Sequence, residues 1–219
     1  KCDTGSDSTV EELEKRIERY LENCEEEMYS IFEKAPDVYY ELDTYEYSYT
    51  DPEDIMEDLI VQCEKDFPAP PEVDYTIKYV HESMEEHTSP AFYLTPPIDD
   101  TENNVIYVNN EYVDDEIYTM IAHEGYPGHL YQTVMWENSE YSLVRNLFSY
   151  PGYTEGWATY TEMYAYDISG LSEPMADLLS CDNAYSLAVS AYIDIGVNYE
   201  GWDVDDVEDY LADLGIGDA

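Results

Sequence analysis

The sequence predicts a mainly α protein with a small antiparallel β-sheet, an α+β fold. Apolar residues recur at helical spacing in several long stretches, and residues 10–34 give the clearest case. Strand-like segments are few and short, and all of them lie between residues 75 and 108. The 219 residues suffice for a substantial core, and no internal repeat or low-complexity linker divides them. We therefore expect one domain over residues 1–219.

The first helix has recognisable signals at both ends. Residues 1–8 are small and polar, so we expect a flexible start. Ser8 and Glu11 have the spacing of a capping box. The apolar pattern that follows predicts a helix to about Lys34, and Pro36 ends it.

A loop and a second helix come next. Residues 37–49 are rich in Tyr and acidic residues and lack a clean period, so we expect a loop there. Thr50 is the expected cap of a helix that runs to about Lys65. The proline-rich stretch 67–71 then stops this helix.

Three strands are expected after this helix. Residues 75–80 alternate and carry β-branched side chains, whereas residues 81–87 predict a short helical turn. Residues 91–94 and 104–108 are two further strand-like runs, separated by a loop. The resulting sheet lies just upstream of the histidine motif described below. Its edge strand either pairs with an extended peptide or is purely structural.

The rest of the chain predicts helices. They are expected at residues 114–122, 128–136, 155–167, 172–199 and 204–214. Gly201 closes the fourth of them, and Asp203 caps the last.

The composition is extremely acidic. The formal net charge is −44, with only eight Lys and Arg. Such a surface repels nucleic acid and anionic membranes, so we expect neither as a partner. It also repels itself, and we expect salt to stabilise the fold. Halophile-like and engineered surfaces share this composition, and the sequence leaves both readings open.

The four cysteines form no recognisable metal or redox motif. They are scattered, without a C-x-x-C pair, at Cys2, Cys24, Cys63 and Cys181. We expect mostly free, partly buried thiols. Neither a signal peptide nor an apolar run long enough to cross a bilayer is visible, so no membrane span is expected and the compartment stays open.

The most informative motif is the stretch His-Glu-Gly-Tyr-Pro-Gly-His at residues 123–129. Two His at positions i and i+4 of one helix commonly hold a zinc ion, with a Glu beside the first His as general base. Here the second His comes at i+6, which lies about 120° away on a regular helix. An uninterrupted helix would therefore aim the two imidazoles in different directions.

The motif supplies its own interruption. Pro127 lacks the N–H that would bond to the carbonyl of His123, and Gly128 tolerates unusual dihedrals. A break that bulges out two residues would bring His123 and His129 to one metal ion. Glu124 would then stand beside the ion as a general base.

A catalytic zinc ion takes three protein ligands and keeps one position open. We expect Glu155, at the start of a helical run, to be the third ligand. Glu162 lies two turns later on the same face and is the alternative ligand, or a partner that orients an imidazole. A structural kink with two ordinary His is the alternative to a metal site.

Four sequence blocks resemble the bacterial "domain of unknown function 885" family. They are the histidine motif at 123–129, Gly-Tyr-Thr-Glu-Gly-Trp-Ala-Thr-Tyr at 152–160, Asp-Ile-Gly-Val-Asn-Tyr-Glu-Gly-Trp at 194–202 and Ser-Pro-Ala-Phe-Tyr-Leu-Thr-Pro-Pro-Ile-Asp-Asp at 89–100. The resemblance covers roughly residues 50–216. That family is similar to the gluzincin metallopeptidases. The resemblance therefore implies a gluzincin-like helical metallopeptidase domain.

The resemblance also implies particular roles. Zinc would be bound by His123, His129 and Glu155, with Glu124 as the base. Family members are usually longer, which implies that this chain is the metal-bearing C-terminal half and that an N-terminal lobe is missing.

Three further positions are candidates for roles in catalysis or substrate binding. The family usually has a His where this chain has Asn198, so Asn198 and its neighbour Tyr199 are the candidate donors to an oxyanion. Arg145 is the only Lys or Arg after Lys78. It is a candidate for binding a substrate carboxylate, or else it pairs with nearby acidic residues.

The function expected from these motifs is zinc-dependent hydrolysis of peptide bonds in small peptides. The first alternative is a non-catalytic or redesigned metallopeptidase-like scaffold that binds metal without turnover. A second alternative is an acidic protein that binds calcium-like ions, but the sequence lacks the D-x-[DN]-x-[DN]-G loop of such sites.

Overall fold

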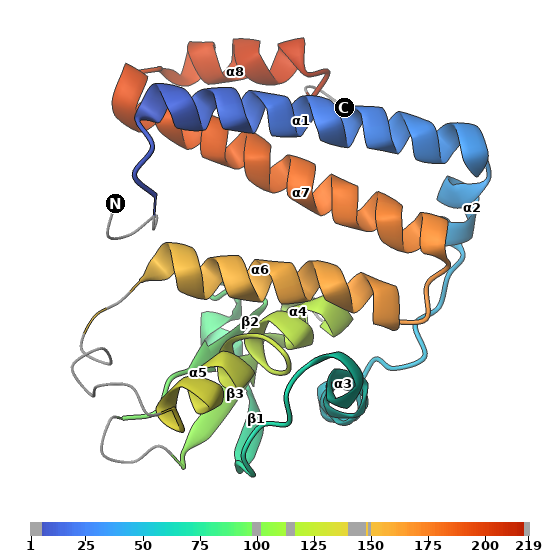
Figure 1. The fold of residues 1–219 in the computed structure, drawn as a ribbon, viewed down its shortest axis with the longest axis vertical. Helices are drawn as coiled ribbons and strands as arrows, with labels where there is room; N and C mark the ends of the chain where they lie inside the picture. Colours follow the sequence, from blue (N-terminus) through green and yellow to red (C-terminus); the bar gives the residue numbers. More distant parts are fainter. Residues whose placement is uncertain (1–5, 98–101, 113–116, 140–147, 149, 217–219) are drawn as a thin grey trace. The chain divides into compact units, whose positions relative to one another are not determined.

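The computed structural model describes residues 6–97, 102–112, 117–139, 148 and 150–216 (Figure 1). The described residues are mostly helical, with one small sheet, so the predicted mainly α class is confirmed. The chain forms two compact units. One comprises Lys1–Ser6 and Asp43–Glu173, and the other comprises Asp7–Leu42 and Pro174–Ala219.

The second of these units is built from helices. They are α1 (Val10–Lys34), α2 (Val38–Asp43), α7 (Glu173–Ile195), the π-helical turn η4 (Gly196–Glu200) and α8 (Val204–Asp213). Apolar side chains of α1, α7 and α8 meet in one cluster, formed by Leu21, Ala188, Val189, Ile17, Tyr185, Ile193, Tyr210, Leu211 and Leu214. Figure 1 shows α1 and α7 running alongside each other, with α8 next to them.

The ends of these helices refine the expectations from sequence. The capping box of α1 is formed by Thr9 and Glu12, one residue later than the expected Ser8 and Glu11. Gly201 ends the π-helical turn with a φ of 84°, in the left-handed region that favours glycine. The predicted loop at residues 37–49 is wrong in part, because Val38–Asp43 form the short helix α2.

In the part of the other unit that the structure describes, four α-helices combine with the sheet. The helices are α3 (Pro52–Asp66), α4 (Ile117–Glu124), α5 (His129–Glu137) and α6 (Pro151–Ile168). The short 3-10 turns are η1 (Glu82–His87) and η2 (Asn110–Tyr112). Asp51, rather than the expected Thr50, caps α3, because its carboxylate accepts hydrogen bonds from the N–H groups of Glu53 and Asp54.

The sheet has three strands in the order β1-β3-β2. They are β1 (Tyr75–Tyr79), β2 (Ala91–Leu94) and β3 (Asn104–Val108). β2 pairs antiparallel with β3, as expected, but β1 pairs parallel with β3. The expectation of a purely antiparallel sheet is therefore wrong. β3 lies between the two earlier strands, parallel to β1 and antiparallel to β2.

The core of this unit lies between the sheet and the helices. α4 packs against β2, α3 and α6, and α5 packs against α6 (Figure 1). The fully buried side chains around α4 include Met56, Leu59, Ile106, Val108, Tyr118, Ile121 and Leu130. Because α4 is buried on several sides, the surrounding core holds the backbone of His123, near the C-terminal end of α4, in place.

Candidate metal centre

The helix that carries His123 breaks where the sequence predicts. α4 ends at Glu124 and α5 begins at His129. The N–H of Gly125 still donates to the carbonyl of Ile121, over 2.8 Å. Helical bonding resumes where Gln132 donates to the carbonyl of Gly128. The residues between them form a detour that contains Pro127.

Gly128 is required at this detour for steric reasons. A Cβ added to it would lie 1.8 Å from the carbonyl oxygen of His123 and 2.4 Å from that of Ala122. Its N–H donates to the Ala122 carbonyl over 2.9 Å, so the two backbone segments touch directly. Only a residue without a side chain fits such an approach.

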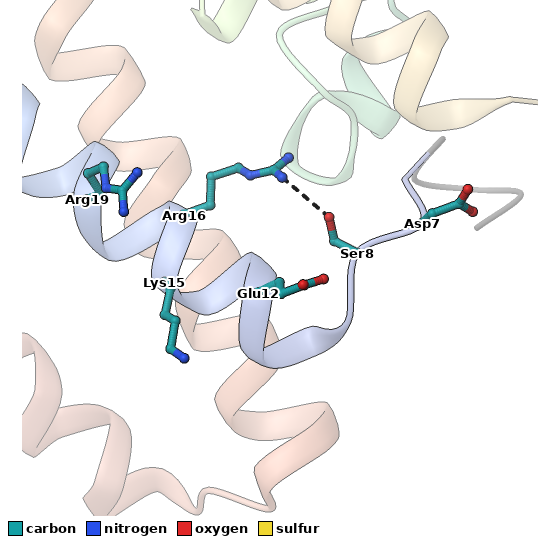
Figure 2. A pocket seen from close by; sticks show the side chains of 6 residues that line it. All are labelled: Asp7, Ser8, Glu12, Lys15, Arg16 and Arg19. Carbon is teal, nitrogen blue, oxygen red and sulfur yellow. Dashed lines mark hydrogen bonds between the residues drawn. The ribbon is translucent and has the colours of Figure 1, made fainter.

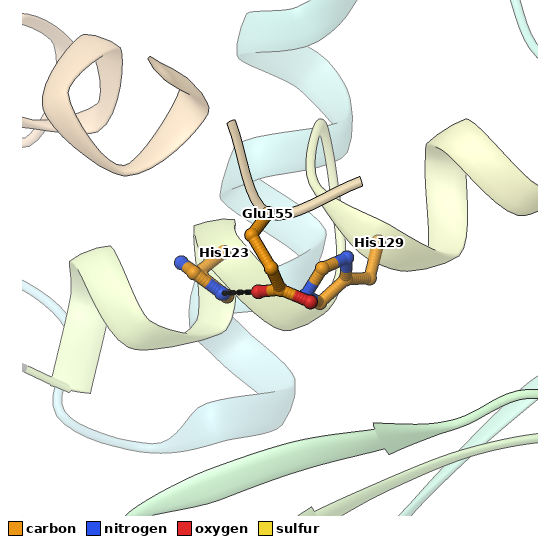
Figure 3. A group of neighbouring side chains, drawn as sticks. All are labelled: His123, His129 and Glu155. Atoms are coloured by element: carbon orange, nitrogen blue, oxygen red, sulfur yellow. Dashed lines mark ion pairs between the residues drawn. The ribbon is translucent and has the colours of Figure 1, made fainter. Parts of the chain in front are cut away.

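The detour brings the two histidines together with Glu155 of α6 (Figure 3). Oε2 of Glu155 lies 3.4 Å from Nε2 of His129 and 3.8 Å from Nε2 of His123. The two imidazole rings are nearly perpendicular, with an interplanar angle of 85° and centroids 4.8 Å apart. The structure therefore brings together the three residues predicted as metal ligands.

The three side chains form a group that could hold a metal ion. Two ligands at about 2.1 Å from a zinc ion and separated by a tetrahedral angle lie about 3.4 Å apart. One ligand atom from each of His123, His129 and Glu155 can be chosen so that all three lie within 4.8 Å of one another. Two imidazoles and one carboxylate are also a ligand set that leaves one coordination position open.

Glu162 contacts His123 from the other side of the ring. Its Oε2 lies 2.9 Å from Nδ1 of His123. With the proton of His123 on Nδ1, this is a hydrogen bond to the carboxylate, and Nε2 keeps its lone pair for a metal. Of the two roles weighed for Glu162, the geometry favours the one that orients the imidazole.

Glu124 lies beside the three candidate ligands and is nearly buried. One of its oxygens, Oε2, accepts a hydrogen bond from the backbone N–H of Tyr93 over 2.7 Å. The other, Oε1, lies 4.0 Å from Nε2 of His123. Burial raises the pKa of Glu124 to about 7, although nearby His123 and the Tyr93 N–H oppose the shift. A carboxyl group with such a pKa can accept and return a proton near neutral pH.

The two histidines differ in their protonation behaviour. Burial lowers the pKa of His123, but the hydrogen bond with Glu162 and the neighbouring carboxylates outweigh it, and the net shift is upward. Burial and the neighbouring His123 lower the pKa of His129. The metal-free site therefore holds a proton more readily on His123 than on His129.

The candidate oxyanion donors belong to the other compact unit. Asn198 donates from its amide to Oδ1 of Asp194 over 2.8 Å. The hydroxyl of Tyr199 lies 3.5 Å from Oε1 of Glu11. Their proposed catalytic role stays a prediction. Arg145, the candidate for binding a substrate carboxylate, lies outside the described residues, and its role stays a prediction as well.

A hollow lies at the start of α1, within the other unit (Figure 2). Its volume is about 560 Å³, and it is lined by Asp7, Ser8, Glu12, Lys15, Arg16 and Arg19. Arg16 donates to the hydroxyl of Ser8, whereas Lys15 and Arg19 point in other directions. Two carboxylates share the lining, so the cations form no convergent anion site.

Two hydrogen bonds at the candidate metal centre are not predicted from the sequence. The backbone N–H of Tyr93 holds Glu124, and the indole N–H of Trp157 donates to the carbonyl of Pro127 over 2.7 Å. Spacing along the chain gives no sign of either contact, since each joins distant segments. The only hint is that Trp157 lies two residues after Glu155 in the motif at 152–160.

Three of the four cysteines lie among the described residues. Cys24, Cys63 and Cys181 are free and buried, as expected, whereas Cys2 lies outside the described residues. Burial raises the pKa of the Cys63 thiol to about 12. Among the described residues, no helix combines the length and the apolar character that a membrane span needs.

The fold and the site together define a helical domain with a small mixed sheet and a possible His, His and Glu metal-binding group. The chain belongs to the family described as "Bacterial protein of unknown function (DUF885)", which it matches over residues 1–216. No curated protein matches the chain.

The solved structures that are similar to this chain include one that aligns with nearly all of it. It is the crystal structure of an inferred lipoprotein from Colwellia psychrerythraea, with a TM-score of 0.77 and 18% sequence identity. The alignment covers 99% of this chain and 41% of that protein. At this identity the similarity shows the fold alone, and this chain spans less than half the length of that protein.

Proposed function

We propose that the chain carries the catalytic centre of a zinc-dependent peptide hydrolase of the gluzincin type. The observation that carries the proposal is the convergence of His123, His129 and Glu155, with the carboxyl group of Glu124 beside them. When bound there, a zinc ion supplies a Lewis acid that polarises a carbonyl and lowers the pKa of a water molecule.

Glu124 is the proposed general base. Its Oε2 is held by the Tyr93 N–H, so the carboxyl group is fixed while Oε1 faces the histidine side. Oε1 takes one proton from water as the oxygen attacks the peptide carbonyl carbon. It then returns the proton to the leaving nitrogen as the C–N bond breaks.

The β2 strand supports a peptide as the substrate. β2 is an edge strand, because only β3 pairs with it in the sheet of described residues. The Tyr93 N–H points away from β3 and toward Glu124. An extended peptide aligned along this edge would pass next to the proposed base. We propose small peptides as the substrate class and a further lobe, supplied by additional chain, as the other wall of the site.

The test combines metal content with peptide cleavage. Purified protein is expected to contain about one zinc ion per chain by mass spectrometry, and to cleave a mixture of short peptides. Glu124→Gln is expected to keep the zinc and lose cleavage by at least about a hundredfold. Glu137→Gln, which makes the same change on α5, serves as the matched control and is expected to keep both.

Each outcome has a separate meaning. Zinc at one per chain without cleavage that depends on Glu124 would support the alternative, a scaffold that binds metal without turnover. Absence of zinc binding from the wild-type protein would overturn the metal site itself.

A further inference from the structure

The backbone detour between α4 and α5 is fastened to α6 by one side chain. Pro127 lies in the detour, and its carbonyl oxygen accepts a hydrogen bond from the indole N–H of Trp157 over 2.7 Å. Trp157 lies on α6, two residues after Glu155. The bond therefore joins the segment between the two histidines to the helix that carries the third candidate ligand.

Aromatic contacts fix the plane of this indole. The ring of Tyr131 is nearly parallel to it, with an interplanar angle of 13° and centroids 6.3 Å apart. Phe67 meets it edge-on, with centroids 5.9 Å apart. Tyr131 is itself two residues after His129 and donates its backbone N–H to the carbonyl of Gly125. The indole thus contacts the detour itself, at Pro127, and the helix that follows it, at Tyr131.

Glu155 is the most exposed of the three candidate ligands. Its side chain is 60% exposed, against 18% for His123 and 13% for His129. No side chain caps the first turn of α6. Gly156 has no neighbour within 4 Å of the place its Cβ would occupy, so nothing packs there. On this turn, the bond from Trp157 joins α6 to the backbone of the histidine segment, beside the contacts that Glu155 itself makes with His129 and His123.

We propose that Trp157 is a positioning residue of the metal centre, which sets the place of Glu155 relative to His123 and His129 through the carbonyl of Pro127. The inference rests on the proposed function, since it concerns the same ligands. Trp157 does not touch the reacting atoms. Its effect is to keep the three ligands in place before a metal ion binds, so that binding requires less ordering.

The test is the zinc affinity of Trp157→Phe, measured by competition with a chromophoric chelator. Phenylalanine keeps most of the ring contacts and removes the N–H donor. We expect the dissociation constant for zinc to rise by about tenfold or more, as for other partners that act outside the ligand set. Trp202→Phe is the matched control, since Trp202 donates to Glu200 in the other unit, and its zinc affinity is expected to stay within about twofold of the wild type.

A second variant separates positioning from loss of stability. Gly156→Ala has room for its methyl group and favours the helix, so the double variant Trp157→Phe with Gly156→Ala is expected to fold at least as well as the single one. Its zinc affinity is still expected to be about tenfold weaker than that of Gly156→Ala alone.

The results distinguish this inference from the proposed function. A dissociation constant within about twofold of the reference in both Trp157→Phe backgrounds, while Glu155→Gln weakens zinc binding, would show that Trp157 only packs. If the wild type binds no zinc, the proposed metal site fails, and the inference fails with it.

Discussion

Nδ1 of His123 lies 2.9 Å from a carboxylate oxygen of Glu162, while Nε2 of the same ring lies 3.8 Å from Glu155. The two ring nitrogens therefore face two different carboxylates, both from α6. One carboxylate can hold the proton of the imidazole while the other shares a metal ion with it.

Glu162→Gln is expected to weaken zinc binding by about ten- to a hundredfold, because an amide holds the Nδ1 proton less strongly than a carboxylate and makes Nε2 a poorer ligand. The dissociation constant for zinc at pH 7 is the measurement, with Glu137→Gln as the control for loss of one negative charge. If the two variants bind zinc equally well, the proposed role of Glu162 is wrong.

Gly128→Ala is expected to destabilise the protein strongly. Its methyl group would lie 1.8 Å from the carbonyl oxygen of His123, so the backbone at the break must move. We expect a loss of at least about 3 kcal/mol in the free energy of unfolding. Denaturant unfolding followed by circular dichroism measures this loss.

Gly156→Ala is the matched control for that substitution. Its methyl group meets open space on a helix, so the protein is expected to become more stable by up to about 1 kcal/mol. Equal losses in the two glycine variants would show that the close approach at Gly128 does not decide the effect.

The sequence predicts the helix break and the convergence of His123, His129 and Glu155, and their role as metal ligands stays a prediction. The missing N–H of Pro127 and the helical angle between His123 and His129 depend only on neighbouring residues. Glu155 could be chosen because a zinc site needs a third ligand and a second helix was expected to start there. The rules for the helix break act over only a few consecutive residues, so the sequence alone is enough to apply them.

The errors concern short elements and pairing between distant segments. α2 has only six residues, Val38–Asp43, which is too short for a helical period to show. The parallel pairing of β1 with β3 depends on how the chain returns between residues 79 and 104, and no local pattern encodes that path. The Tyr93 and Trp157 contacts were missed for the same reason.

Salt is expected to raise the melting temperature. The formal net charge of −44 makes the folded chain repel itself, and added ions screen this repulsion. Between 0.1 and 1 M sodium chloride we expect an increase of at least about 5 °C, measured by differential scanning calorimetry. Choline chloride at the same ionic strength tests the cause. An equal rise in the two salts would indicate screening alone. A smaller rise in choline chloride would show that binding of sodium ions also contributes. An unchanged melting temperature in both salts would contradict the prediction.

The metal-free protein is expected to carry a stability penalty from Glu124 at neutral pH. Burial raises the pKa of this carboxyl from its ordinary value of 4.5 to about 7, so between these values the folded protein keeps a proton that the unfolded chain has lost. The contribution of the group to stability is therefore fully present below pH 4.5 and is lost as the pH rises through 7.

Glu124→Gln removes this titration, because glutamine stays neutral. In the presence of a chelator, we expect the variant to match the wild type near pH 4.5 and to exceed it above pH 7, by up to about 3 kcal/mol in the free energy of unfolding. Denaturant unfolding of both proteins from pH 4.5 to 8 provides the measurement, and Glu64→Gln, at an exposed position of α3, controls for the removal of one charge. A difference between the variant and the wild type that stays constant across this range would show that Glu124 is ionised in the folded protein throughout, and its assignment as a base that titrates near neutral pH would be lost.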